Sequence, residues 1–372
     1  MKKNILYVGG FNFNTTNASS IRVIENARFL KKLNFNVEVL GKISSTRFIN
    51  EIKVSNIVTE EENFSRNISI IEFKVKSLKI NYIIAYNYPP IAFYKLIKFC
   101  KVNNIILIPD LTEWYGIDGG FTLDKGVRFV LHQWRMYVLN NKCDYKIVAS
   151  SYLDAKYKGS NNLKLPFVTI ENSKFEDISN LVIQNLSFVY AGSPGNNFSK
   201  DRLDIVLKAF AKVKEKHTNF SLKVIGLTYE SLLEITSVKK DVVALNENLT
   251  CYGRMPNEAC VEIIKQTNFI VFSRDVKRVT SAGFPTKVFE AFKYGLPVLT
   301  NKTSDISTYV TEKNGFLVEL ADVDEFSEKI ETILSSDTLT LQTIINNCRT
   351  KNPFFYDNFK EQTLFFFKEM NR

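Results

Sequence analysis

Two kinds of segment alternate along this chain: short apolar runs rich in Ile, Val and Phe, and longer stretches in which apolar residues recur every three or four positions. The runs predict β-strands and the periodic stretches predict helices. In the first half, the apolar runs lie at 4–10, 37–43, 82–87, 105–110 and 145–150. Amphipathic stretches at 19–33, 91–101 and 123–141 separate most of them, whereas 44–80 is less regular.

A second series begins near residue 186. Its apolar runs lie at 186–192, 221–226, 249–253, 269–273, 297–300 and 315–319. The stretch 200–217 keeps a period of 3.6 residues in its apolar positions, which is typical of a helix that packs one face on a core. Strands that alternate with helices predict a parallel sheet covered by helices on both faces.

Two such series predict an α/β protein with two Rossmann-like, doubly wound domains that face each other across a cleft. The expected domains are 1–178 and 179–350, followed by a separate C-terminal segment at 351–372. In an open parallel sheet a ligand binds beyond the carboxyl ends of the strands. The residues that directly follow each strand are therefore the first candidates for a functional site.

Charge distinguishes the two halves. Residues 1–180 contain 25 Lys and Arg against 16 Asp and Glu, and so carry +9 of the chain's formal net charge of +10. A basic face attracts the phosphates of nucleic acids, anionic lipids or charged substrates, although many proteins carry such an imbalance without any of these partners. No motif that interleaves aromatic and basic residues is present, so nucleic acid is not an expected partner.

Other classes of protein are excluded. Every apolar run is interrupted well before the ~18 residues that a membrane-spanning helix needs, and the first run is too short for a signal peptide. The five cysteines are scattered without a CxxC pair, which predicts a reduced, cytoplasmic protein rather than a disulfide framework or a zinc site. His132 and His217 have no Ser, Cys or metal-ligand partner at motif spacing, so no hydrolase triad is expected.

The stretch 281–300, SAGFPTKVFEAFKYGLPVLT, holds the most distinctive candidates. Pro285 suits the first position of a helix and Gly295 suits its end. Lys287 and Glu290 are three residues apart and share one face near the helix start. The helix N-terminus and Lys287 favour a bound anion, while Glu290 accepts hydrogen bonds from hydroxyls. A diphosphate joined to a ribose offers both features; an i,i+3 ion pair on a solvated helix is the alternative.

Three more basic residues come after strands of the second domain: Lys200, Arg254 and Arg274. Lys200 follows a glycine turn at 192–195 near a helix start, where a cation beside free N–H groups suits a phosphate. No GxxxxGK[ST] motif is present, and an ordinary surface lysine is the alternative. Together with Lys287, these side chains favour a diphosphate more strongly than any one of them does.

The first domain also has candidate residues at or just after the ends of its predicted strands. Gly10 comes at the end of the first strand, where the absent side chain lets a ligand approach the backbone. A simple turn is the alternative, because GxGxxG is absent. Asp110 and Glu113 come at the end of the strand at 105–110 and are candidates for an acceptor site.

Taken together, these segments resemble the GT-B glycosyltransferases of family 4. The stretch 281–300 is similar to their donor-binding signature, in which a Gly-Phe turn precedes a helix ending in Glu-Ala and then Gly-x-Pro-Val. Residues 188–210 resemble the strand and helix that open their second domain, and 252–274 the strand, helix and strand before the donor loop. Residues 144–157 resemble the end of their first domain. The resemblance spans nearly the whole chain and is strongest over 186–320.

The resemblance implies transfer of a sugar from a nucleotide sugar, usually a UDP-sugar, with retention at the anomeric carbon and with no metal or other cofactor. Carried over by position, the catalytic roles fall to Arg274, Lys200 and Glu290, and the donor contacts to Gly10, Ser193, Lys200, Arg254, Gly283, Phe284, Lys287 and Glu290. Glu290 would bind the ribose and Lys200 the diphosphate. Positive charge and helix N–H groups would stabilise the departing diphosphate in place of a metal.

Two positions depart from the family pattern. Ala282 stands where most members have a glutamate eight residues before Glu290, and Ser193 stands where many have an arginine. Both differences fall at positions that would contact the sugar or the diphosphate of the donor. A non-catalytic GT-B protein that binds a glycan or a partner glycosyltransferase is therefore the alternative to an enzyme.

As an enzyme, the chain is expected to extend a lipid-linked or glycan acceptor during synthesis of a bacterial capsule, exopolysaccharide or lipopolysaccharide. Its expected place is the cytoplasm, at the inner face of the cell membrane, where the basic first domain would contact anionic lipid. In the family, a C-terminal helix crosses back onto the first domain. The aromatic residues Phe354, Phe355, Phe359 and Phe365 would then be core anchors, and membrane contact is the alternative.

Overall fold

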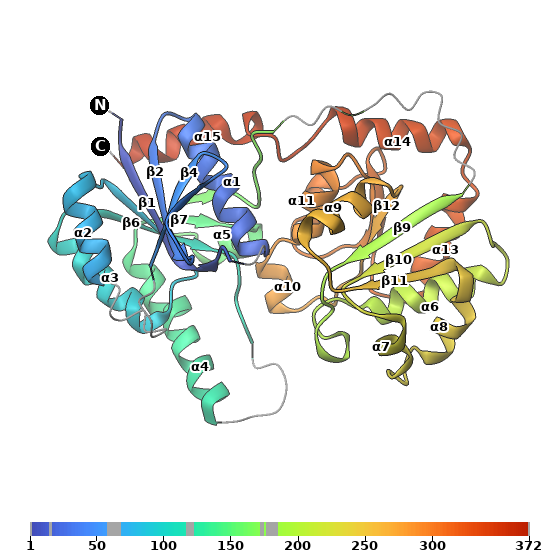
Figure 1. Cartoon of the computed structure of the whole chain (residues 1–372). Coiled ribbons are helices and arrows are strands. Elements are labelled where there is room, and N and C mark those ends of the chain that lie inside the picture. Colours follow the sequence, from blue (N-terminus) through green and yellow to red (C-terminus); the bar gives the residue numbers. More distant parts are fainter. Residues whose placement is uncertain are drawn as a thin grey trace. The chain divides into compact units, whose positions relative to one another are not determined.

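The computed structural model describes residues 2–14, 17–57, 68–116, 123–171, 175 and 185–370. The chain folds into two compact units (Figure 1). Unit 1 comprises Met1–Asn172, Ser281–Phe284 and Phe354–Arg372, and unit 2 comprises Ser173–Thr280 and Pro285–Pro353. The predicted boundary after residue 178 lies outside the described residues. The sequence did not predict that the short segment Ser281–Phe284 would group with unit 1.

Unit 1 is built on a single sheet. Its strands, within the described residues, are β1 (Asn4–Asn12), β2 (Asn36–Lys42), β3 (Arg47–Ile49), β4 (Ile52–Asn56), β5 (Tyr82–Tyr86), β6 (Ile106–Leu111), β7 (Tyr145–Val148) and β8 (Asn161–Lys164). They lie in the order β3-β4-β2-β1-β5-β6-β7-β8, and only the β3–β4 pair is antiparallel. The less regular stretch after residue 43 thus supplies a small edge hairpin.

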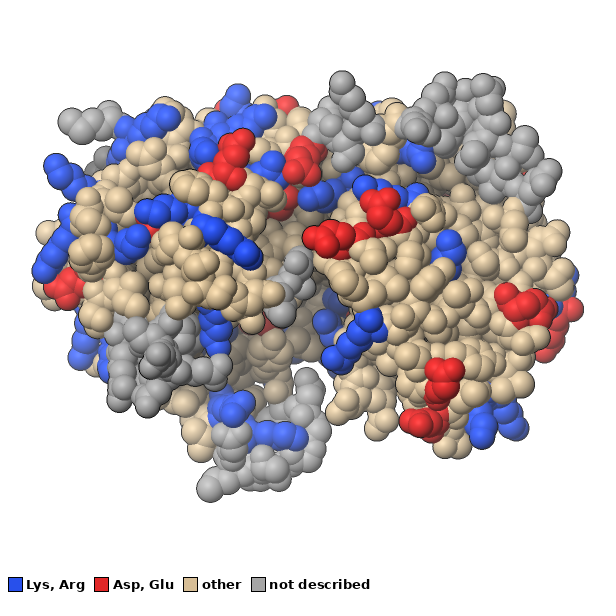
Figure 2. Space-filling model, in the orientation of Figure 1, with Lys and Arg blue, Asp and Glu red and all other residues tan. Residues whose placement is uncertain are grey.

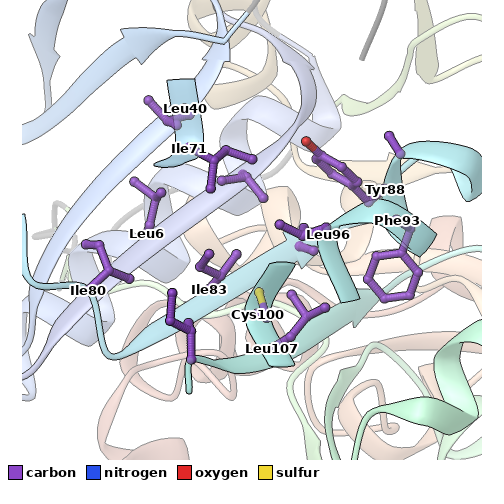
Figure 3. Packing of buried hydrophobic residues seen from close by; sticks show 14 of the residues in the cluster. Leu6, Leu40, Ile71, Ile80, Ile83, Tyr88, Phe93, Leu96, Cys100 and Leu107 are labelled. Atoms are coloured by element: carbon purple, nitrogen blue, oxygen red, sulfur yellow. The ribbon is translucent and has the colours of Figure 1, made fainter. Parts of the chain in front are cut away.

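Helices cover both faces of this sheet (Figure 1). They are α1 (Ala18–Lys32), α2 (Ile68–Leu78), α3 (Pro90–Val102), α4 (Leu123–Trp134), α5 (Ser151–Lys156) and α15 (Asp357–Glu369), and a π-helical turn, η2 (Arg135–Leu139), continues α4. Successive side chains of β1 point to opposite faces of the sheet. Leu6 packs in the core on the side of α3 with Ile83, Leu96 and Cys100 (Figure 3). Tyr7 faces α1, where Asn26 donates a hydrogen bond to its hydroxyl.

Unit 2 is built on a second, wholly parallel sheet. Its described strands are β9 (Leu186–Ala191), β10 (Phe220–Ile225), β11 (Leu249–Gly253), β12 (Phe269–Val271), β13 (Val298–Asn301) and β14 (Gly315–Val318). Their order is β11-β10-β9-β12-β13-β14. The chain builds outward from β9 in one direction and then returns to add β12 on the other side. The strand order therefore reverses between β9 and β12, which is where open parallel sheets bind ligands.

The helices of unit 2 also lie on both faces of its sheet (Figure 1). They are α6 (Leu203–Lys214), α7 (Tyr229–Leu233), α8 (Lys239–Leu245), α9 (Asn257–Lys265), α11 (Thr286–Lys293), α12 (Ile306–Tyr309), α13 (Val323–Leu334) and α14 (Thr338–Thr350). The short helix α10 (Arg278–Ala282) begins in unit 2, and its last two residues group with unit 1. α6 packs against α8 and α13, whereas α9 and α11 contact β9 and β12. The predicted α/β fold with two parallel sheets is confirmed.

The C-terminal helix α15 groups with unit 1. Phe354 and Phe359 are buried, as predicted. Phe365, however, is 62% exposed, so its predicted role as a core anchor is wrong. The next residue and the one after it point inward instead: Phe366 packs edge-on against Tyr145, and Phe367 against Tyr82. The helical period decides this, because only one side of α15 faces the sheet.

Candidate functional site

A cluster of buried charged side chains lies where the strand order of unit 2 reverses. Asp201, in the loop between β9 and α6, is fully buried. Its Oδ1 accepts a hydrogen bond from Arg274 Nε at 2.7 Å, and its Oδ2 accepts one from Lys287 Nζ at 2.7 Å. The Tyr190 hydroxyl donates a third bond to Oδ2 at 3.0 Å. One carboxylate thus holds two cations that come from different segments, the loop after β12 and the first turn of α11.

This cluster carries an excess of positive charge. Burial lowers the pKa of Lys287, and the like charges of Arg274 and Lys200 lower it further, against the opposing effect of Asp201. Burial raises the pKa of Asp201, but Lys287 and Arg274 together lower it more, so it ends well below its usual value. Asp201 is therefore a carboxylate at neutral pH. One carboxylate between two cations leaves the site suited to an added anion.

The main chain beside the cluster is held in conformations that favour glycine. Gly192, Gly226 and Gly253 lie at the carboxyl ends of the neighbouring strands β9, β10 and β11, with φ angles of 138°, 112° and 66°. A Cβ on Gly226 would lie 2.2 Å from the carbonyl oxygen of Gly192. A Cβ on Gly192 would lie 3.0 Å from Lys287 Nζ. The ammonium group of Lys287 therefore packs directly on the backbone that follows β9.

We expect Gly192→Ala to lower the free energy of unfolding by about 1–3 kcal/mol, because alanine is strained at this φ and its methyl group would press on Lys287. Chemical denaturation measures the change. Gly159→Ala is the control, since a Cβ there meets nothing within 4 Å, and its effect should stay within about 0.5 kcal/mol. Equal stability of the two variants would show that Gly192 does not constrain the cluster.

Asn301 at the end of β13 fixes the loop that carries Arg274. Its Oδ1 accepts a hydrogen bond from the backbone N–H of Arg274 at 2.9 Å, and its Nδ2 donates one to the Arg274 carbonyl at 2.8 Å. The Ser273 hydroxyl also donates to Oδ1 at 3.2 Å. The backbone of Arg274 is thus held from β13, and its side chain from Asp201. Two independent restraints define where this guanidinium lies.

Helix α11 places Lys287 and Glu290 in different environments. It begins at Thr286 with Pro285 as its N-cap, one residue later than predicted, and it ends before Gly295 (φ 67°), as predicted. No side chain caps its N-terminus. Lys287 pairs with Asp201 rather than with Glu290, so the i,i+3 ion pair considered from the sequence does not form.

The carboxylate of Glu290 is half-buried and accepts no hydrogen bond from any described residue. Burial raises its pKa, against the opposing charges of Lys287 and Lys293. A partly buried carboxylate without hydrogen bonds is unusual, because the charged form has lost water and gained no donor in return. A ligand with hydroxyl groups would supply the missing donors.

Three other predicted donor contacts do not join the cluster. Lys200 and Ser193 are exposed in the loop after β9, and Lys200 acts on Lys287 only through its charge. Arg254 is exposed after β11, and β10 and β9 separate that strand from β12. None of the three makes a hydrogen bond or ion pair with Asp201, Arg274 or Lys287 in the described part of the chain. Of the basic candidates, Arg274 and Lys287 are the ones that the fold brings together.

Gly283 and Phe284 group with unit 1. The Phe284 side chain is buried and contacts the rings of Phe167 and Phe354, with ring centroids 6.4 and 5.6 Å apart. The Ser150 hydroxyl donates to the carbonyl oxygen of Ala282 at 2.7 Å. The phenylalanine of the Gly-Phe turn therefore packs in a core. The role of the two backbone N–H groups as donor contacts stays a prediction.

In unit 1, Gly10 and Asp110 do not lie where the sequence placed them. β1 continues to Asn12, so Gly10 is exposed within the strand rather than at its end. Asp110 lies inside β6 and is fully buried. Arg22 Nη2 donates to its Oδ1 at 2.8 Å and the Tyr7 hydroxyl donates to its Oδ2. Asp110 is thus one half of an internal ion pair, and an acceptor cannot reach it in this conformation.

Sequence reasoning missed Asp201, the residue that assembles the site. It also missed the supporting roles of Tyr190 and Asn301. A signal for Asp201 was present, since it is an acidic residue directly after Lys200 in a loop already expected to hold a phosphate. Which of two adjacent charged residues turns inward depends on the backbone of that loop, and the sequence pattern does not contain this information.

Within the described residues, no group of three His, Cys, Asp or Glu side chains is placed to hold a metal ion. In the same part of the chain, no helix is both long and apolar enough to span a bilayer.

The fold is similar to that of a known class of protein. Residues 187–351, somewhat less than half of the chain, match the model of the family described as glycosyl transferases group 1. The match covers β9 to α14, which includes Asp201, Arg274, Lys287 and Glu290. The resemblance predicted from the sequence is therefore confirmed, and the fold is that of GT-B glycosyltransferases.

One curated relative and two solved structures illustrate what the chain is similar to. The capsular polysaccharide biosynthesis glycosyltransferase CapM of Staphylococcus aureus is 27% identical over 204 residues, which cover 52% of this chain and 49% of CapM. The chain thus spans about half the length of this curated relative. Sucrose-phosphate synthase from Thermosynechococcus elongatus has a TM-score of 0.70 at 12% identity, over 99% of both chains. Anabaena HepE, solved with UDP and glucose, has a TM-score of 0.65 at 15% identity, over 99% of this chain and 100% of HepE.

Proposed function

We propose that the chain is a retaining glycosyltransferase that moves a sugar from a nucleotide sugar, in particular a UDP-sugar, to a lipid-linked or glycan acceptor without a metal. One observation carries this proposal: Asp201 holds Arg274 and Lys287 together at the strand reversal of unit 2. Lys287 lies on the same helix as Glu290, which is half-buried and accepts no hydrogen bond from a described residue. The two cations suit a diphosphate, and Glu290 suits a ribose diol.

In this reaction the bond between the anomeric carbon and the diphosphate oxygen breaks, and the diphosphate leaves with the bonding electrons. A bond to an acceptor hydroxyl oxygen forms on the same face, and the hydroxyl proton passes to the departing diphosphate oxygen. Charge develops on the departing oxygen, so Arg274 and Lys287 stabilise the transition state more than the ground state. Their contact with Asp201 fixes both cations before the donor binds. Little reorganisation is then needed during the reaction.

The choice of a UDP-sugar and of surface polysaccharide rests on the relatives. HepE was solved with UDP and glucose, and CapM is named for capsular polysaccharide biosynthesis. We extend the proposal to work at the inner face of the cell membrane. Lys and Arg side chains are spread over the visible face of unit 1 (Figure 2), which would attract anionic lipid.

The first test is a thermal-shift panel with UDP, GDP, ADP and CMP on the wild-type chain and on Glu290→Ala. A nucleotide at 100 times its dissociation constant stabilises the folded state by roughly 2.7 kcal/mol, which gives a visible shift. We expect UDP to raise the wild-type midpoint and to leave that of Glu290→Ala unchanged. Glu328→Ala, which removes an exposed glutamate from α13, should keep the full UDP shift.

If a nucleotide other than UDP raises the melting midpoint of the wild-type chain, the proposed donor site stands and the proposed donor changes to a sugar linked to that nucleotide. If no nucleotide at millimolar concentration stabilises the wild-type chain, the proposal fails. Ala282 and Ser193 then favour the second candidate, a non-catalytic GT-B protein that binds a glycan or a partner glycosyltransferase.

A further inference from the structure

Unit 1 contains two buried arginines in opposite situations. Arg22 is 2% exposed and forms an ion pair with Asp110 at 2.8 Å. Arg135, at the start of the π-helical turn after α4, is 4% exposed and forms no ion pair with a described carboxylate. Burying an unpaired cation costs several kcal/mol, which proteins normally offset with a carboxylate. Arg135 therefore needs an explanation that Arg22 does not.

The hydrogen bonds of Arg135 leave part of its guanidinium unused. Nη1 donates to the carbonyl oxygen of Tyr88 at 3.1 Å, and Nη2 lies 3.3 Å from His132 Nδ1. Nε is buried and has no partner. A guanidinium presents five N–H donors in a planar fork. These contacts are with a carbonyl oxygen and an imidazole nitrogen, and none of its hydrogen bonds is made to an anion.

Arg135 lines a pocket of about 550 Å³ in unit 1. The pocket is formed at the carboxyl edge of the sheet, by residues that follow β5 and β6 and by α4. Its other charged or titratable lining residues are Glu113, Tyr115, Lys125, Arg128 and His132. The Tyr115 hydroxyl donates a hydrogen bond to Glu113 Oε2. Among the described lining residues, the Arg135 guanidinium is the buried cation that has no carboxylate partner.

We propose that this pocket binds an oxyanion of the acceptor, a phosphate or a carboxylate, through Arg135. The oxyanion supplies to Arg135 the negative charge that no described residue provides, and it can bond the guanidinium fork at two points. Identifying the ligand as an acceptor rests on the proposed transferase function, whereas the presence of an oxyanion site does not.

The chain contains its own reporter for this pocket. Its two tryptophans, Trp114 and Trp134, are sequence neighbours of Glu113 and Arg135. Both lie in unit 1, and the Trp114 indole N–H donates to Gln133 of α4 at 3.0 Å. Tryptophan fluorescence therefore follows this pocket rather than the Asp201 cluster of unit 2.

The test is a fluorescence titration of the full chain with inorganic pyrophosphate and with glucuronate, at constant ionic strength in potassium chloride. We expect a saturable change with at least one anion. Tighter binding of pyrophosphate identifies a phosphate-bearing acceptor, and tighter binding of glucuronate identifies a carboxylate-bearing one. Arg135→Gln should weaken the better ligand at least tenfold. Lys158→Gln, which removes an exposed cation that does not line the pocket, should leave its affinity unchanged.

Glu113→Gln provides an independent check if Arg135→Gln does not fold. Removing the negative charge of Glu113, which lines the pocket, should tighten anion binding at least threefold. Lys287→Met should leave the fluorescence titration unchanged, which separates this pocket from the diphosphate site. The proposal is overturned if neither anion gives a saturable change, or if folded Arg135→Gln and Glu113→Gln both bind like the wild type. UDP-dependent stabilisation, measured separately, decides the transferase proposal whatever these titrations show.

Discussion

Asp201→Asn is expected to lower the free energy of unfolding by about 3–5 kcal/mol, the usual effect of removing one partner from a buried ion pair. Asparagine has nearly the same shape as aspartate, so the loss comes from charge rather than from packing. Arg274 and Lys287 would face each other without the carboxylate that now lies 2.7 Å from each. The two like charges would separate, and both donor contacts would lose their positions.

Denaturant unfolding measures this change. Asp324→Asn is a matched control, because Asp324 pairs with Lys212 at 2.6 Å but is 71% exposed. Exposed ion pairs contribute about 0–1 kcal/mol, so the control should differ little from the wild type. A small effect of Asp201→Asn would mean that water or other groups already compensate the two cations. Asp201 would then not organise the site.

The dependence of stability on pH gives a second measure of the same residue. The folded-state pKa of Asp201 lies below its usual value, so the folded protein binds its proton less readily than the unfolded chain. The contribution of Asp201 to the free energy of unfolding is therefore complete at a pH well above its pKa in the unfolded chain, about 3.9. This contribution is lost progressively as the pH falls below roughly 5. Asp201→Asn should lack this part of the acid-induced loss of stability.

Lys287→Met is expected to reduce donor-dependent glycosyl transfer by roughly 10²- to 10³-fold, the usual effect of removing one preorganised group that stabilises developing charge. Methionine fills a similar volume and is suited to a buried position. Asp201 keeps its bond to Arg274 in this variant, so the fold should survive. The loss should appear in the rate of transfer with a saturating donor as well as in the affinity for UDP.

Lys265→Met is the control for that experiment. It removes the same charge from α9, where Lys265 is 52% exposed and pairs with Glu262 of its own helix. Its transfer rate should match the wild type. Normal transfer by Lys287→Met would show that Lys287 only balances the charge of Asp201, and would leave Arg274 as the one cation of this cluster on the diphosphate.

The sequence predicted the fold because its evidence was periodic and repeated. Strands and helices alternate through both halves, and each apolar run has to bury its side chains. Irregular positions were predicted less well. β1 and β6 each extend beyond their predicted ends, which places Gly10 and Asp110 inside strands. The strand ends differ from the predicted ones by two residues in β1 and by one in β6, and Asp110 is a buried partner of Arg22 rather than a ligand contact.

For the site, the sequence by itself determined which segments follow the strands of unit 2 and which charged residue types they carry. Arg274, Lys287 and Glu290 were identified in this way. Only the tertiary structure decided that Asp201 turns inward to join the two cations, that Lys200 and Arg254 stay exposed, and that Arg135 is buried without a carboxylate partner among the described residues. The physical reason is that charge pairing acts between residues far apart in the chain. Asp201 and Lys287 are separated by 86 positions, and no local pattern records which partners such residues will meet.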